Sequence, residues 1–189
     1  MGIKKIVQKE IDLNSGRSAQ IKKLLVNVIA NPKIIPQRIP AMQNDKIIFC
    51  LSDNRITDFG QFLTGGVNEQ FKTRNKSFRA SYYEIWDKVP ETKQDYWLNR
   101  MYFHIYKIDE NSTKEYVLLH TDPIDDDITH GNYKRSPHLH IKNISDEDIS
   151  HAHIALNITN YNDAFLNINN LNACFLQHIK MIANQILKI

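Results

Sequence analysis

The sequence has few cysteines, and their positions exclude one class of protein. Cys50 and Cys174 are far apart in the chain, and both lie in apolar runs. A disulfide framework like that of small secreted proteins needs more cysteines at closer spacing. Both residues are therefore predicted to be reduced and to lie in the core.

Long apolar runs and a leader segment are also absent from the sequence. No apolar run approaches the roughly 20 residues that a membrane-spanning helix needs. The N-terminal residues do not show the charged, apolar and small-residue regions of a signal peptide. We expect a soluble, cytoplasmic protein that does not contact a membrane.

Several well-known catalytic motifs are missing as well. The chain has no Gly-rich phosphate loop, no Gly-x-Ser-x-Gly elbow, no His-Glu-x-x-His helix and no Cys-x-x-Cys pair. The run Asp125-Asp126-Asp127 lacks the glycine and terminal glutamate of a calcium loop. The segment around His138 is not the motif of histidine-triad nucleotide hydrolases, because Lys142 stands where the third histidine would be.

Histidine is the residue that the chain has in excess. Seven of the eight histidines lie between His104 and His153, and residues 135–157 contain two His-x-His pairs. Apolar residues alternate with the histidines of both pairs, which is the period of a strand with one buried face. We predict a β-hairpin in which His140 lies opposite His153. The four histidines of its polar face are His138, His140, His151 and His153.

The rest of the pattern predicts an α+β fold. Residues 1–189 are expected to form a single domain, with a strand and helix arm over 1–45 and a sheet with a C-terminal helix over 46–189. The first helix is expected after a turn at 14–17, with Ser18 as its cap, and the last after Asn169 or Asn170. The antiparallel β-sheet has one apolar face, which an N-terminal and a C-terminal helix cover. Its expected strands are residues 3–13, 46–51 (buried on both faces), 78–86, 100–108, 115–121 and the hairpin at 135–157.

The alternation of the strands assigns cations, histidines and tyrosines to the other face of the sheet. If the strands are neighbours, this uncovered face combines positive charge, proton carriers and aromatic rings. Thr, Lys and Glu usually fill such positions, so six histidines argue against an ordinary solvated face. The predicted face consists of Arg79, Tyr83, Arg100, Tyr102, His104, Tyr106, Tyr116, His120, His138, His140, Lys142, His151 and His153.

The first functional hypothesis is an enzyme that acts on RNA or another phosphorylated ligand without a cofactor. Imidazole titrates near neutral pH and can act as general base and general acid. In this hypothesis His140 and His153 transfer protons, and His138, His120 and His104 support them. The net charge of +3 permits contact with nucleic acid without demanding it. The expected phosphate and substrate contacts are Arg100, Arg135, Lys142, Tyr102 and Tyr106.

Two other functions stay open at this point. Histidines opposite or diagonal to one another on a sheet can share an ion. His138, His140, His151 and His153 could therefore hold zinc, with Asp122 or the acidic run adding a carboxylate. The face could instead dock a cognate protein or a second copy of the chain, in which case the protein is a binding or assembly module.

The order of elements from Tyr102 onward resembles the TumE-type toxins of bacterial toxin–antitoxin pairs. Tyr102-Phe103-His104 corresponds to their aromatic strand, and His120-Thr121-Asp122-Pro123 stands where they show Arg-Tyr-Asp-Asn. Pro137-His138-Leu139-His140 corresponds to their His-x-His strand, and residues 171–186 to their C-terminal helix. The match covers less than half of the chain. It implies a bacterial toxin or defence ribonuclease.

Overall fold

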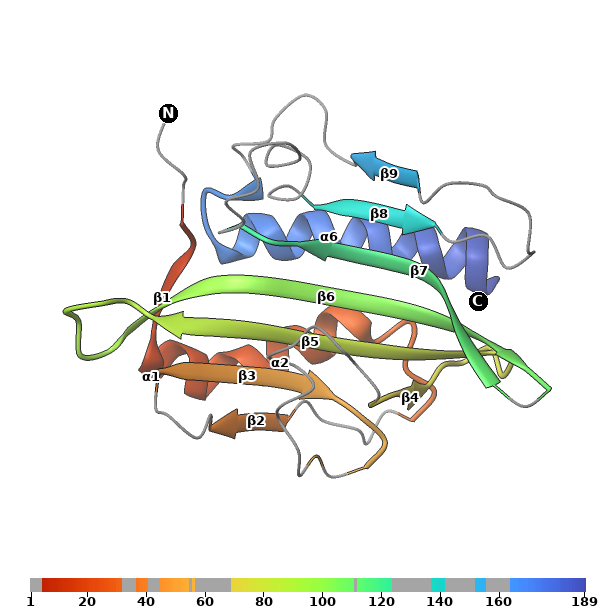
Figure 1. Ribbon diagram of the computed structural model, residues 1–189, viewed down its shortest axis with the longest axis horizontal. Helices are drawn as coiled ribbons and strands as arrows, with labels where there is room; N and C mark the ends of the chain where they lie inside the picture. Colours follow the sequence, from red (N-terminus) through yellow and green to blue (C-terminus); the bar gives the residue numbers. More distant parts are fainter. Residues whose placement is uncertain are drawn as a thin grey trace.

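An antiparallel sheet is the centre of the computed structural model (Figure 1). The structure describes residues 5–31, 37–40, 45–54, 56, 69–110, 112–123, 137–141, 152–155 and 164–189, with 37–40 and 152–155 as backbone only. The strands run in the order β2-β3-β5-β6-β7-β8-β9, with β1 paired to β6 and β4 to β5. Their bounds are β1 Val7–Lys9, β2 Gln37–Pro40, β3 Lys46–Leu51, β4 Phe71–Lys72, β5 Phe78–Lys88, β6 Asp95–Asp109, β7 Ser112–Thr121, β8 His138–Ile141 and β9 Ala152–Ala155.

Two helical segments cover one face of this sheet, and in Figure 1 both lie behind the strands. The first consists of α1 (Glu10–Asp12), the π-helical turn η1 (Leu13–Arg17) and α2 (Ser18–Leu25). The second consists of α6 (Ile168–Ile182) and the π-helical turn η2 (Ala183–Leu187). The main core lies between these helices and the sheet, and it includes Leu24, Leu171, Phe175, Phe103 and Leu119. The predicted α+β fold, with one apolar sheet face under an N-terminal and a C-terminal helix, is confirmed.

A second, smaller apolar cluster lies on the opposite face of the sheet. It contains Ile48, Cys50, Tyr83 and Ile85, with Tyr102 packed against it. Strand β3 contributes to both clusters, which confirms that this strand is buried on both faces. Cys50 is buried, whereas Cys174 is only partly buried, and neither forms a disulfide.

The N-terminal helix begins earlier than the sequence pattern predicted. The expected turn at 14–17 is a helical turn, and helical structure is continuous from Glu10 to Leu25. Ser18 is therefore inside the helix and does not cap it. Leu13 and Arg17 are one helical turn apart and both buried, so this turn faces the core. The prediction failed because an arginine is normally expected at the surface, and the burial of Arg17 is not evident from the sequence.

The C-terminal helix also begins before the predicted position. Its cap is Asn167, whose side chain accepts a hydrogen bond from the backbone N–H of Asn170 at 3.0 Å. An extended asparagine that accepts in this way satisfies one of the free N–H groups of the first turn. The predicted caps, Asn169 and Asn170, lie within the helix.

A register shift between Ile105 and Tyr106 changes the face of one predicted residue. Ile105 pairs with Val117, but Tyr106 pairs with Glu115, so Tyr116 has no partner on β6. A bulge of this kind reorients side chains that follow strict alternation elsewhere. Tyr116 stacks on Phe78 and packs against the main core, and not on the histidine face as predicted.

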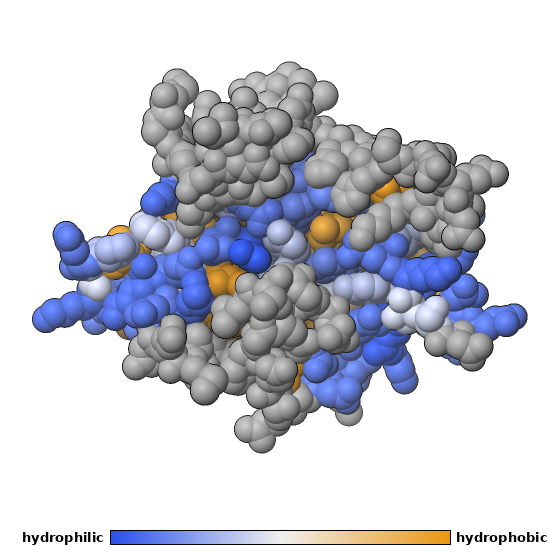
Figure 2. Space-filling model, in the orientation of Figure 1, coloured by the Kyte–Doolittle hydropathy of each residue, from blue (hydrophilic) through white to orange (hydrophobic). Residues whose placement is uncertain are grey.

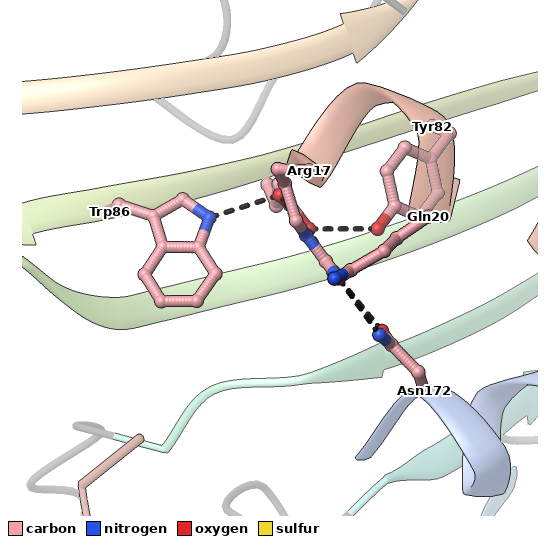
Figure 3. Close-up of polar contacts among 6 residues, drawn as sticks. Arg17, Gln20, Tyr82, Trp86 and Asn172 are labelled. Atoms are coloured by element: carbon pink, nitrogen blue, oxygen red, sulfur yellow. Dashed lines mark hydrogen bonds and ion pairs between the residues drawn. The ribbon is translucent and has the colours of Figure 1, made fainter. Parts of the chain in front are cut away.

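A buried ion pair ties both helices to the sheet (Figure 3). The guanidinium of Arg17 donates to both carboxylate oxygens of Glu84, at 2.7 and 2.6 Å. Tyr82 and Trp86 donate to the same carboxylate, at 2.9 and 3.0 Å. Arg17 also donates to Asn172 of α6 at 2.9 Å. Because every charged oxygen has donors, the pair is retained in the core without an unsatisfied charge.

Candidate functional site

Three histidines from two neighbouring strands form a cluster on the face away from the helices. His120 lies on β7 and is the direct ladder partner of His138 on β8. His140 follows on the same face of β8, because alternate residues of a strand point to the same side. The ring centroids are 4.0 Å apart for His120 and His138, 4.5 Å for His120 and His140, and 4.9 Å for His138 and His140.

The nitrogen atoms of this triad converge on one point. One ring nitrogen from each of His120, His138 and His140 lies within 4.8 Å of the other two. The Nε2 atoms of His120 and His140 are only 2.7 Å apart. Two nitrogen lone pairs at that distance repel each other unless a proton or a cation lies between them. The three residues are 5%, 0% and 8% exposed, so bulk water does not separate them.

A carboxylate fixes the orientation of His120. Its Nδ1 lies 2.8 Å from Oδ2 of Asp122, two residues further along the chain. The hydroxyl of Tyr102 donates to both oxygens of Asp122 at 2.9 Å. Because a carboxylate can only accept, this geometry assigns the imidazole proton of His120 to Nδ1. The Nε2 lone pair of His120 is then directed at the centre of the triad.

Tyr102 keeps its proton in this arrangement. Burial, together with the charge of Asp122, holds the pKa of Tyr102 well above its usual range. The ring of Tyr102 also contacts the ring of His120, with centroids 4.6 Å apart. Tyr102 is therefore a fixed hydrogen-bond donor that supports both Asp122 and His120.

A layer of aromatic rings continues from the triad across β6 and β5. Tyr102 contacts Tyr83 at 5.0 Å and His104 at 5.8 Å between ring centroids. His104 stacks on Tyr106 at 5.7 Å, and its Nδ1 lies 2.8 Å from Oε2 of Glu115. Burial raises the pKa of Tyr106 to about 12. Ring faces in this layer are occupied by other rings of the protein.

Arg100 lies on the same face at the edge of this layer. Its ladder partner is Ile85, and it precedes Tyr102 by two residues. Its Nε donates to the side-chain oxygen of Asn99 at 3.0 Å. The positive charge of Arg100 partly offsets the effect of burial on the pKa of Tyr83. Figure 2 shows this side of the molecule, where the described surface is mostly hydrophilic with small hydrophobic patches.

The structure brings together most of the candidate residues that the sequence indicated. Strand alternation correctly grouped Arg100, Tyr102, Tyr106 and the histidines of β6, β7 and β8 on one face. That face was expected to be uncovered, but His104, His120, His138 and His140 are all buried. The backbone of His153 is the ladder partner of His140, as predicted. The side chains of His151, Arg135, Lys142 and His153 lie outside the described residues.

Two features of the site were not foreseen from the sequence. Glu115, the partner of His104, was not identified as a site residue. Asp122 was considered only as one of two alternative carboxylate ligands of zinc, yet its oxygens are hydrogen-bonded to His120 and Tyr102. The spacing His120-x-Asp122 at the end of β7 was the available signal, because residues two apart in extended chain share a face.

Comparisons with protein family models, curated proteins and solved structures give no match to this chain. The resemblance to TumE-type toxins therefore stays a prediction. Among the described residues, no helix combines the length and the apolar character needed to cross a membrane.

Proposed function

We propose that this protein is a hydrolytic metalloenzyme whose zinc-class ion is held by His120, His138 and His140. The observation that carries the proposal is the convergence of three buried imidazole nitrogens within 4.8 Å. Buried polar groups need partners, and three imidazoles directed at one another are well satisfied by a shared cation. Imidazole is a common ligand of zinc, copper, iron and nickel, and zinc is the most usual occupant of a three-histidine set.

The number of ligands among the described residues favours a catalytic site. Structural zinc sites usually have four protein ligands, whereas catalytic sites have three and leave one position for water. Three histidines of the described chain come together, and Asp122 is engaged elsewhere. A zinc ion lowers the pKa of its bound water to about 7 and so supplies hydroxide at neutral pH. Hydrolysis is the reaction class that such a centre supports.

The surroundings of His120 also support the proposal. Histidine ligands of metals usually donate their other ring N–H to a carboxylate, which fixes the tautomer and makes the ligand more basic. His120 and Asp122 have this arrangement, at 2.8 Å. Tyr102 in turn fixes Asp122 through two hydrogen bonds.

Only a small movement is needed to admit the ion. Zinc–nitrogen bonds of about 2.0–2.1 Å in a tetrahedral site place two ligand nitrogens about 3.3 Å apart. The Nε2 atoms of His120 and His140 are 2.7 Å apart. The side chains would therefore separate by about 0.6 Å, which small torsional adjustments of the two rings provide.

The test is metal analysis of the full chain, purified without an affinity tag that binds metals. We expect about one zinc-class ion per chain in the wild type. The variant His140→Ala should lose the ion, and His178→Ala on α6 should retain it. His138→Ala and His120→Ala should each weaken binding as well. A metal-free wild-type protein that gains no thermal stability from added zinc, cobalt or copper would falsify the proposal.

A stability measurement keeps this test valid if a variant folds poorly. An ion that binds only the native state stabilises it by RT ln(1 + [M]/Kd), or about 2.7 kcal/mol at 100 times Kd. Added zinc should therefore raise the melting temperature of the wild type and of His178→Ala. The melting temperature of His140→Ala should not respond to zinc.

A second candidate function rests on the short contact between His120 and His140. With a proton in place of a cation, these two residues form a hydrogen-bonded pair oriented by Asp122. Such a pair can act as general acid and base in cleavage of RNA without a metal. In that case the purified protein would cleave an RNA oligonucleotide in the presence of EDTA, and His140→Ala would not.

The burial of the described tyrosines favours the metal proposal over a function in which these rings stack on nucleic-acid bases. Recognition of unpaired bases needs aromatic faces that are open to the ligand. Tyr83 is 0% and Tyr106 8% exposed, and their rings pack against His104. The same burial argues against a docking function for these side chains, because a docking surface must be accessible.

A further inference from the structure

We infer that the metal centre takes a phosphate group as its ligand and that Arg100 is the second anchor of that group. The inference rests on the proposed metal centre and names the chemical class of its substrate. Its basis is the position, burial and partners of Arg100 relative to the histidine triad.

Arg100 lies next to the triad on the sheet face. Tyr102 is the ladder partner of His120, and Arg100 precedes Tyr102 by two residues on β6. Arg100 is therefore a diagonal neighbour of His120, and such positions are about 7–8 Å apart on a sheet face. A long arginine side chain at that distance can reach a ligand bound at the triad.

The partners of Arg100 are uncharged: its Nε donates to Asn99, and it also forms a side-chain hydrogen bond with Tyr83. Arg17 and Arg79 each form an ion pair, with Glu84 and Asp53 respectively. Within the described residues, the guanidinium of Arg100 has no carboxylate within ion-pair distance, and its Nε donates to the amide oxygen of Asn99. Burying a charge without a counter-ion is costly. A half-buried arginine in this position is stabilised by an anionic ligand.

The carboxylate of Asp122 is already engaged by other partners beside the triad. Asp122 accepts from Tyr102 and lies 2.8 Å from Nδ1 of His120. A divalent ion and the guanidinium of Arg100 together exceed the single negative charge of Asp122. The described residues next to the triad therefore carry a net positive charge when the ion is bound, which attracts anions.

The number of oxygen atoms distinguishes phosphate from carboxylate. A guanidinium binds anions best through two parallel N–H···O bonds. The metal ion needs a further oxygen in its open position. A ligand that satisfies both anchors fully must offer three oxygens. A phosphate group has four, with the ester oxygens of a mono- or diester included, whereas a carboxylate has two.

The test uses the full chain with cobalt in the metal site, because the visible spectrum of bound cobalt reports changes in its ligands. Inorganic phosphate, diethyl phosphate and acetate are titrated separately into the wild type. We expect the spectral titration to give inorganic phosphate or the diester an affinity at least about tenfold higher than that of acetate, because the phosphate forms one more charge-assisted hydrogen bond. Tighter binding of the diester indicates a nucleic-acid-like substrate, and tighter binding of inorganic phosphate indicates a monoester.

Two arginine variants then separate the inference from the proposed function. Arg100→Gln should bind cobalt like the wild type but bind the preferred phosphate at least about tenfold more weakly. Arg79→Gln, whose arginine already pairs with Asp53, should bind both like the wild type. Two results would overturn the inference alone, provided that cobalt binds normally. One is an unchanged phosphate affinity in Arg100→Gln, and the other is a wild type that binds acetate as tightly as phosphate. Failure of the wild type to bind cobalt overturns the metal centre as well.

Discussion

Replacing Arg17 by methionine tests whether the buried ion pair holds the helical layer on the sheet. Arg17 and Glu84 are 2% and 0% exposed, and Arg17 donates four hydrogen bonds to Glu84, Gln20 and Asn172. Methionine retains much of the apolar stem but removes all four donors. Glu84 would keep only Tyr82 and Trp86 as donors and would be a buried charge without a counter-ion. Removing one partner of such a pair costs about 3–5 kcal/mol.

The assay is urea unfolding at neutral pH, followed by circular dichroism, with the free energy of unfolding obtained by linear extrapolation. Arg79→Met is the matched control, because its ion pair with Asp53 is partly exposed at 23% and 22%. Exposed and partly exposed pairs contribute about 0–1 kcal/mol. The double variant Arg17→Met/Glu84→Leu should recover most of the loss, since it removes the uncompensated charge. A cost for Arg17→Met no larger than that for Arg79→Met would refute this reasoning.

Three further predictions follow from the described contacts. Asp122→Asn should weaken metal binding by about 10–100-fold, because it removes the carboxylate that orients His120. Competition with a coloured chelator measures the affinity, and the control Glu115→Gln, next to His104, should leave it unchanged. The free energy of unfolding of the metal-free protein should fall as the pH rises above about 10, by about 1.4 kcal/mol per pH unit for each buried tyrosine. The reason is that burial raises the folded-state pKa of Tyr106 to about 12 and the pKa values of Tyr83 and Tyr102 further. Urea unfolding at several pH values measures this decline, which should be less steep in Tyr106→Phe. Asn167→Ala should cost about 1 kcal/mol through loss of the helix cap, whereas Asn169→Ala should leave the melting temperature nearly unchanged.

Much of the candidate site was predictable because strands alternate strictly. The positions of Tyr102, His104 and His120 in their strands placed them on one face before any pairing was known. The register of His140 and His153 followed from the simplest pairing of two short strands. These inferences depend on local periodicity, which a single sequence contains.

The features that were missed depend on contacts between distant segments. Arg17 and Glu84 are 67 residues apart, and each alone looks like a surface residue. Glu84 breaks the apolar alternation of β5, and only its partners explain why it is buried. The register shift at Ile105 and Tyr106 moved Tyr116 to the helix side, which no local pattern indicated. The burial of the histidines likewise depends on the packing of the whole chain.

The position of Asn172 in the buried network has a consequence for synthesis on the ribosome. Arg17 and Asn172 are separated by 155 residues, so their hydrogen bond forms only after nearly the whole described chain has been made. Until α6 emerges, the apolar sheet face that it covers is exposed to solvent or to chaperones. Chains that stop before residue 172 should therefore be aggregation-prone and be degraded rapidly. Residues 17–172 are therefore expected to fold cooperatively, and not segment by segment.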